Sequence, residues 1–113
     1  MGYKDENSLE ERTNESEKIL SRYPDRIPII CESLDKNAPK LDKKKFLVPY
    51  DLTMGQFMFI LRKRIKLKRE EAIYLFVNNT ICTSSTIMST IYQEHKDEDG
   101  FLYIKYNGES TFG

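Results

Sequence analysis

The sequence contains little of what enzymes and metal sites are usually built from. Its 113 residues include one histidine, His95, and two cysteines, Cys31 and Cys82. No histidine and cysteine spacing typical of a metal site occurs. A glycine-rich phosphate loop and a nucleophile motif with its base are also missing. We therefore expect no catalytic residues, no metal and no cofactor, and we predict that the protein is not an enzyme.

Long apolar runs are missing as well. No stretch approaches the roughly 20 apolar residues that a membrane-spanning helix needs. The first residues, MGYKDENSLEE, are acidic and polar, which does not fit a secretory signal peptide. Each cysteine lies in a short apolar stretch, IPIICE or NNTICT, and we interpret both as buried, reduced thiols. The alternative, a disulfide between them, gains no support from their spacing. These features predict one soluble, monomeric domain in the cytoplasm.

Acidic and basic side chains are equal in number, 18 of each, but they are unevenly distributed. Residues 36–69 hold eleven basic and two acidic side chains. A segment this basic favours an acidic partner, such as a peptide, a lipid head group or a nucleic acid. One hypothesis is therefore a basic-surface binding module for tubulin or nucleic acid. We rank it low and expect no nucleic acid, because no nucleic-acid-binding motif accompanies the basic residues.

The N-terminal residues carry two helix-start patterns. Ser8-Leu9-Glu10-Glu11 has the form of a capping box, and residues 14–17, NESE, offer a second start. We predict one short helix over residues 9–12 and another over residues 15–22, which Pro24 limits.

Two strands and a long helix follow. RIPIICESL is a β-branched run typical of a strand. KKKFLVPY predicts a second strand at a sheet edge, because Pro49 has no N–H to donate and lysines commonly protect sheet edges from pairing.

The segment DLTMGQFMFILRKRIKL predicts a long helix. Thr53 and Gln56 predict a capping box at its start, and Leu52 and Phe57 predict a hydrophobic staple. The apolar face of this helix is predicted from three- and four-residue spacing at Phe57, Ile60, Leu61 and Ile65.

The remaining segments complete the predicted fold. EAIYLFVNNTIC indicates a strand, an Asn-Asn turn and a short return, SSTIMSTIYQEH a short helix with a serine cap, and GFLYIKY a final strand. The order predicts an α+β fold, a β-grasp with a four-stranded mixed sheet, a long helix and two N-terminal helices. We predict a single domain over residues 1–113: a helical extension (1–23), a β-grasp core (24–107) and a flexible tail (108–113).

Several long strings resemble a known family. RYPDRIPIICE, LDKKKFLVPYDLTMGQFMFILRKRI, YLFVNN, YQEHKDEDGFLYIKY and the closing FG are similar to the autophagy ubiquitin-like modifiers, the GABARAP-like class conjugated to phosphatidylethanolamine. The resemblance extends from about Asn14 to Gly113. It implies a ubiquitin-like core with two extra N-terminal helices.

The resemblance also implies a role for Gly113. In such modifiers an activating and a conjugating enzyme pass the terminal glycine carboxyl group to the amine of phosphatidylethanolamine, and a cysteine protease processes or releases the protein. Glycine suits this role because, without a Cβ, its carbonyl can be approached closely. The resemblance further implies attachment to the autophagosome membrane, and presence in the vacuole or lysosome, once the lipid is attached.

An edge strand such as FLVP can bind an extended peptide by main-chain hydrogen bonds. The family binds aromatic-x-x-aliphatic motifs of receptors, usually preceded by acidic residues. The resemblance places the aromatic residue among Glu15, Ile19, Pro28, Ile30, Lys45, Leu47 and Phe101. It places the aliphatic residue among Phe46, Val48, Pro49, Leu52, Phe57, Ile60 and Arg64. Without the resemblance, core packing would explain most of these apolar residues equally well.

Overall fold

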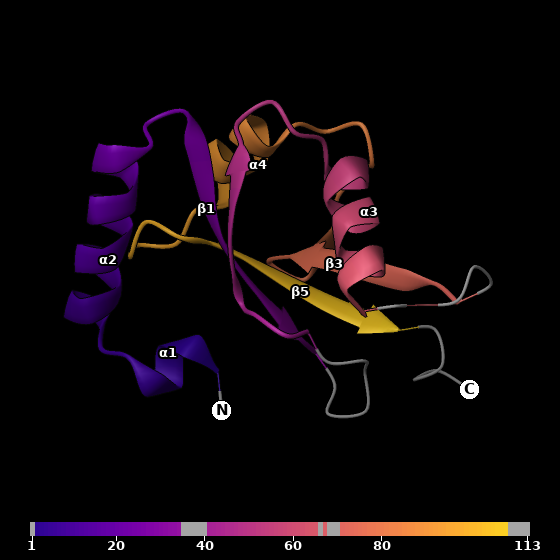
Figure 1. Ribbon diagram of the computed structural model, residues 1–113, viewed down its shortest axis with the longest axis horizontal. Helices are drawn as coiled ribbons and strands as arrows, with labels where there is room; N and C mark the ends of the chain where they lie inside the picture. The colour runs from indigo at the N-terminus through magenta and orange to yellow at the C-terminus, as the bar shows by residue number, and fades with distance from the viewer. Residues whose placement is uncertain (1, 35–40, 66, 68–70, 109–113) are drawn as a thin grey trace.

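A five-stranded mixed sheet forms the centre of the computed structural model, which describes residues 2–34, 41–65, 67 and 71–108 (Figure 1). The strands stand in the order β2-β1-β5-β3-β4. The central pair, β1 and β5, is parallel, and the other neighbours are antiparallel. The strands are β1 Arg26–Ser33, β2 Lys45–Pro49, β3 Ile73–Val77, β4 Thr80–Ile81 and β5 Leu102–Gly108. The predicted α+β, ubiquitin-like β-grasp is confirmed.

The short return strand β4 adds a fifth strand to the four that were predicted. The turn before it is the predicted Asn-Asn turn, in which Asn78 and Asn79 have φ values of 49° and 65°. Asparagine tolerates this left-handed region better than most residues. Strand β5 includes Gly108, the first residue of the predicted tail, and residues 109–113 lie outside the described part of the chain.

Helices cover both faces of the sheet, and Figure 1 shows α2 and α3 on opposite sides of it. Ile27, Ile29 and Cys31 of β1 belong to the main core, whereas Ile30 belongs to a second apolar cluster. Because successive strand residues point to opposite faces, this division explains why β1 is buried on both sides. The helices are α1 Tyr3–Glu6, α2 Leu9–Arg22, α3 Met54–Ile65 and α4 Met88–His95. None of the described helices is long and apolar enough to cross a bilayer.

Helix α3 begins as its sequence predicts. The Thr53 N–H donates to Gln56 Oε1 at 2.9 Å, and the Gln56 N–H donates to Thr53 Oγ1 at 3.1 Å, which completes the capping box. Phe57 and Leu61 are fully buried in the main core. The apolar spacing therefore placed the inward face of α3 correctly.

The predicted bounds of the N-terminal helices are wrong. The structure has one helix at residues 3–6 and a longer one at residues 9–22, so Asn14 lies inside α2 rather than at a helix start. The Ser8–Glu11 capping box does start α2. Tertiary contacts hold the helix through Asn14, because Arg12 pairs with Asp99 at 2.8 Å and Ser16 Oγ donates to the Asp99 carbonyl at 2.5 Å.

The serine cap predicted for the short helix within SSTIMSTIYQEH is also wrong. Helix α4 begins after Ile87, and no side chain caps it. Its first amides are bound by the chain before α3 instead: the Met88 N–H donates to the Leu52 carbonyl at 2.7 Å, and the Ser89 N–H to the Tyr50 carbonyl at 2.9 Å. Backbone carbonyls thus accept the hydrogen bonds from the N–H groups at the start of α4, which a serine side chain would otherwise accept.

Candidate functional site

Strand β2 lies at the edge of the sheet, as the proline and the lysines predicted. It pairs with β1 in antiparallel register, with Pro28 opposite Leu47 and Ile30 opposite Lys45. Within the residues that the structure describes, no strand pairs with its other edge. That edge therefore presents backbone N–H and C=O groups that an added strand could bind.

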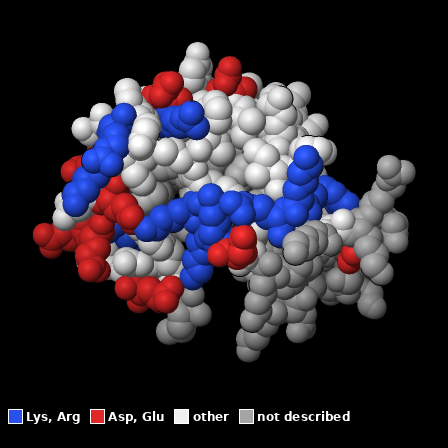
Figure 2. All heavy atoms as spheres, in the orientation of Figure 1, with Lys and Arg blue, Asp and Glu red and all other residues white. Residues whose placement is uncertain are grey.

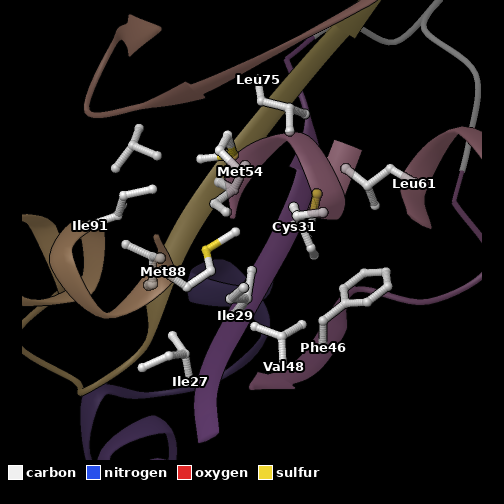
Figure 3. Close-up of a cluster of buried hydrophobic side chains, with 14 of the residues drawn as sticks. Ile27, Ile29, Cys31, Phe46, Val48, Met54, Leu61, Leu75, Met88 and Ile91 are labelled. Atoms are coloured by element: carbon white, nitrogen blue, oxygen red, sulfur yellow. The ribbon is translucent and has the colours of Figure 1, made fainter. Parts of the chain in front are cut away.

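The side chains of β2 alternate between the two faces of the sheet. Phe46 and Val48 are buried in the main core, and Figure 3 shows both on the same side of β2, near Ile29. Lys45 is exposed and Leu47 is half-buried. One short strand therefore contributes to an apolar site on each of its sides.

The structure brings the predicted aromatic-pocket residues together between α2 and β2. Ile30 and Phe101 are fully buried in one cluster, against which Ile19 packs. The Lys45 ammonium lies 2.5 Å from Glu15 Oε1, so this ion pair joins α2 to β2. Pro28 of β1 lies opposite Leu47 of β2, just as Ile30 lies opposite Lys45, so the four residues are neighbours on one face of the sheet.

Tyr3, which no sequence pattern marked, belongs to the same buried cluster as Ile30 and Phe101. Its side chain packs edge-on against Phe101, with ring centroids 5.6 Å apart, and is 5% exposed. Its hydroxyl donates to the Glu15 carboxylate, and the Lys45 ammonium lies 5.2 Å from its ring centroid. A single apolar residue in a four-residue helix forms no periodic pattern, so no sequence signal marked it.

The charges at this site are strongly coupled. Burial raises the pKa of Tyr3, and its hydrogen bond to the Glu15 carboxylate raises it further. Burial also raises the pKa of Glu15, but hydrogen bonds from Lys45 and Tyr3 outweigh burial and leave that pKa below its usual range. Glu15 is therefore an anion at neutral pH, and it holds the Lys45 side chain beside the cluster.

The predicted aliphatic-pocket residues also lie together, between β2 and α3. Phe46 and Phe57 form an edge-to-face pair with centroids 5.4 Å apart, and both are buried. Leu52 and Ile60 are partly buried against the same core. The Arg64 guanidinium lies 5.7 Å from the Phe46 ring centroid. Val48 is buried with the phenylalanines, and Pro49 is exposed at the end of the strand.

Lysine and arginine side chains form a band across the middle of this face (Figure 2). Two basic side chains from the basic segment of residues 36–69 are paired within the chain. Lys44 lies 3.2 Å from Glu6, and Arg64 lies 3.1 Å from Asp42. The charges of Lys44 and Arg64 are therefore each partly neutralised by a carboxylate of the same chain.

The remaining predictions concern Gly113, metal ligands and the two cysteines. Gly113 is outside the described residues, so its role stays a prediction. The part of the chain that the structure describes contains no group of three or more metal-ligating side chains. Both cysteines are free; Cys31 is buried, as we predicted, whereas Cys82 is partly exposed rather than buried.

Comparisons with known sequences identify close relatives over nearly the whole chain. A family model described as "Autophagy protein Atg8 ubiquitin like" matches residues 11–113. Autophagy-related protein 8 of Mycosarcoma maydis is 56% identical over 112 residues, which cover 98% of this chain and 95% of that protein. Autophagy-related protein 8 of Schizosaccharomyces pombe is also 56% identical over 112 residues, with 98% and 93% covered.

Solved structures agree with the sequence comparisons. The crystal structure of Trypanosoma brucei ATG8 matches with a TM-score of 0.92 and 49% identity, covering 100% of this chain and 98% of that one. Plasmodium falciparum Atg8, solved in complex with a Plasmodium falciparum Atg3 peptide, matches with a TM-score of 0.87 and 44% identity, covering 95% of each chain. The similarity thus extends to the whole fold.

Proposed function

The chain belongs to the Atg8 family of ubiquitin-like autophagy proteins, and we propose that it acts as a lipid-conjugated modifier and peptide adaptor in autophagosome formation. Gly113 is the attachment point, and the free edge of β2 is the peptide-binding site. The observation that carries the proposal is this edge strand, with one apolar site toward α2 and another toward α3.

The covalent step joins the Gly113 carboxyl group to the amine of phosphatidylethanolamine. An activating enzyme uses ATP to form the acyl adenylate and releases pyrophosphate. Its cysteine thiolate then displaces AMP to form a thioester, which passes to a cysteine of the conjugating enzyme. The lipid amine attacks the thioester carbonyl, loses a proton and releases the thiol, leaving an amide that a cysteine protease can hydrolyse. The partners supply this chemistry, and the chain is not an enzyme.

The peptide lies alongside β2 and in the same direction. Lys45 of the aromatic site begins β2 and Pro49 of the aliphatic site ends it, and Phe46, Leu47 and Val48 alternate between the two sites. A motif whose aromatic residue comes first therefore runs parallel to β2, and its two anchor residues are about 10 Å apart in an extended chain. Burying both anchors contributes roughly 3–5 kcal/mol before ordering costs. Micromolar affinity requires about 8 kcal/mol in all, so the main-chain hydrogen bonds of the added strand must supply much of the remainder.

Partners and location follow from this role. We expect a monomer that is cytoplasmic when free and bound to the autophagosome membrane, and later the vacuole or lysosome, when lipidated. Its protein partners are the activating and conjugating enzymes, the cysteine protease and receptors with aromatic-x-x-aliphatic motifs. The peptide complex of the Plasmodium falciparum relative supports the conjugating enzyme as one of them. Pairing of Lys44, Lys45 and Arg64 with carboxylates of the same chain lowers the charge that these three residues offer a polyanion.

Reconstitution tests the conjugation step. The matching activating and conjugating enzymes, ATP and phosphatidylethanolamine liposomes are mixed with wild-type protein or with Gly113→Ala. We expect the wild type to show a shifted band on a gel and to float with the liposomes, whereas Gly113→Ala remains in solution. A wild type that stays unattached with an active enzyme set would contradict the proposal.

A further inference from the structure

A cleft of about 330 Å³ lies between helix α1, strands β1 and β5 and the turn that joins β3 to β4. Its volume is at the lower end of the range for small-ligand sites. Helix α1 contributes Lys4 and Asp5 to the lining, β1 contributes Glu32, and β5 contributes Tyr103 and Lys105. None of the described lining residues belongs to either predicted peptide site, so the cleft is a separate feature of the surface.

Three carboxylates line the cleft, those of Asp5, Glu32 and Asp97. A backbone N–H group donates to one oxygen of each, at 2.7–3.1 Å. Burial raises the pKa of Glu32 and of Asp97, but hydrogen bonds and neighbouring lysines outweigh burial and leave both pKa values below their ordinary range. The carboxylates are therefore fixed in place, and Glu32 and Asp97 are ionised at neutral pH.

The two lysines that line the cleft are held less firmly. Lys4 pairs with Asp97 at 2.6 Å and Lys105 pairs with Glu32 at 3.1 Å, but the lysine side chains are 49% and 42% exposed. An exposed lysine side chain can move into solvent at little cost. The carboxylates cannot turn away without leaving backbone N–H groups unpaired. An incoming cation can therefore replace a lysine, whereas an incoming anion has no comparable exchange.

The charge of the cleft also favours a cation. With His95 neutral, the three carboxylates exceed the two lining ammonium groups by one negative charge. The Asn78 amide nitrogen lies 3.0 Å from His95 Nδ1, a contact that a neutral imidazole accepts. Lys44 lies 3.8 Å from Glu32, but it also pairs with Glu6 at 3.2 Å. Including both of these neighbours leaves the excess negative charge unchanged.

Tyr103 makes the cleft better suited to a guanidinium group than to an ammonium group. The Lys4 ammonium lies 4.6 Å from the Tyr103 ring centroid while it pairs with Asp97. An aromatic ring and a carboxylate thus already attract a cation to one position. A guanidinium group there can stack on the ring and donate two parallel hydrogen bonds to the carboxylate, which an ammonium group cannot do.

We propose that this cleft binds an arginine side chain of a partner protein, which displaces Lys4 from Asp97 and Tyr103. The side-chain amides of Asn78 and Asn79 also line the cleft and can hydrogen-bond to the main chain beside that arginine. The inference goes beyond the peptide-adaptor function and does not depend on it. Because the cleft and the peptide sites share no described lining residue, one partner can place a motif on β2 and an arginine in the cleft.

Amide NMR titration with small peptides tests the proposal. The probe Ac-GRG-NH2 carries one arginine, Ac-GKG-NH2 and Ac-GQG-NH2 replace it with lysine and glutamine, and Ac-GEG-NH2 is anionic. We expect Ac-GRG-NH2 to shift the amide signals of Lys4, Asn79 and Asp97 with a Kd of about 2 mM in dilute buffer. The lysine probe should bind about threefold more weakly, and the other two should not bind.

Variants assign the binding to the cleft. Asp97→Asn should weaken binding of Ac-GRG-NH2 at least about fivefold, and the amide oxygen can still accept the backbone hydrogen bond. Glu98→Gln is the matched control, because Glu98 is exposed beside Asp97 but does not line the cleft. Lys4→Met should instead strengthen binding about threefold, because it removes the cation that the arginine must displace. The remaining signals of residues 2–6 report whether α1 stays docked in each variant.

Two further ligands identify the kind of partner. If free L-arginine binds more tightly than Ac-GRG-NH2, the cleft serves an amino acid, which overturns its assignment to a partner protein. The peptide EEEWSTL-amide, labelled with fluorescein, carries acidic residues before an aromatic-x-x-aliphatic motif and reports on the β2 site. Saturation with this peptide should change the Kd of Ac-GRG-NH2 by less than about twofold, because the two sites are separate.

The other outcomes contradict the inference. If the lysine or glutamine probe binds as tightly as Ac-GRG-NH2, or if Asp97→Asn leaves binding unchanged, the cleft is not an arginine site. Weaker binding by Lys4→Met with α1 still docked, or saturable binding of Ac-GEG-NH2, would mean that the lysines receive an anion. Failure of EEEWSTL-amide to bind would count against the adaptor function and leave this inference standing.

Discussion

Gly100 is held in a conformation that residues with side chains rarely adopt, with a φ of 92°. A Cβ built there would lie 2.4 Å from Ser16 Oγ and 3.1 Å from Ser16 Cβ. The Ser16 hydroxyl is itself committed to the Asp99 carbonyl. Close approach of α2 to the turn before β5, and with it the position of buried Phe101, therefore depends on glycine at this position.

Replacing Gly100 with alanine should lower the free energy of unfolding by about 2 kcal/mol, because positive φ and steric overlap both oppose a Cβ. Urea titration followed by circular dichroism measures the change. Gly2→Ala is the control, since Gly2 has a φ of −86° and its added Cβ would meet the ends of two side chains, Glu32 at 3.2 Å and Asp5 at 3.6 Å.

A double variant separates the two causes of that loss. Ser16→Gly removes the side chain that overlaps the new Cβ, so Gly100→Ala should cost less in a Ser16→Gly background than in the wild type. Equal costs in both backgrounds would show that the steric contact with Ser16 contributes nothing.

Helix α1 is held by three carboxylates from distant parts of the chain. Tyr3 donates its hydroxyl to Glu15 and its backbone N–H to Glu32 at 2.7 Å, and Lys4 pairs with Asp97 at 2.6 Å. Burial raises the pKa of each carboxyl group, but hydrogen bonds and neighbouring cations outweigh burial. The pKa values of Glu15, Glu32 and Asp97 therefore lie below their ordinary values.

Docking of α1 should accordingly fail in acid. A carboxyl group whose pKa is lower when α1 is docked favours the docked state at pH values above its ordinary pKa. This contribution is lost as the pH falls through the lowered pKa of the docked state. The ordinary values are 4.5 for the glutamates and 3.8 for Asp97. We expect amide NMR signals of residues 2–6 to move toward unfolded positions below about pH 4, before those of β1 change.

Glu15→Gln provides the control for the acid transition. It removes one of the three titrating groups, so the pH dependence of the α1 signals should become shallower, while the β1 signals remain as in the wild type. Simultaneous change of α1 and β1 signals in the wild type would mean that α1 does not undock separately.

The elements differ in how well the sequence could predict them. The start of α3 was predictable because Thr53 and Gln56 contact each other across one helical turn. The start of α2 at Ser8 was predicted, but its continuation through Asn14 was missed because Asp99 holds the middle of the helix. The start of α4 was missed because Leu52 and Tyr50 bind its first amides. Tyr3 was missed for the same reason: its partners Glu15, Glu32 and Phe101 are all distant in sequence. The candidate peptide residues came from family resemblance, since burial alone does not distinguish a pocket from a core.

Over the whole molecule, acidic and basic side chains are equal in number, but they are not evenly distributed over the surface. A band of lysine and arginine side chains crosses one face of the molecule (Figure 2), and basic side chains beside the two peptide sites bind carboxylates elsewhere in the chain, as in the Lys45–Glu15 and Arg64–Asp42 pairs. An acidic peptide must therefore compete with internal partners for these cations. Exchange of one ion pair for another yields little affinity, whereas the long-range field still attracts the peptide before contact.

Salt should therefore change the rate of peptide association more than the rate of dissociation. For EEEWSTL-amide, stopped-flow anisotropy should show an association rate constant about five- to tenfold lower in 0.5 M than in 0.02 M NaCl, because the Debye length shortens from roughly 20 Å to 4 Å. The dissociation rate constant, which reports on the two apolar anchors, should change by less than about twofold. The uncharged probe SSSWSTL-amide is the control, and its association should be nearly independent of salt. If salt acted mainly on dissociation of the acidic probe, the lysines would be holding the bound peptide, and the apolar sites on either side of β2 would not be its main anchors.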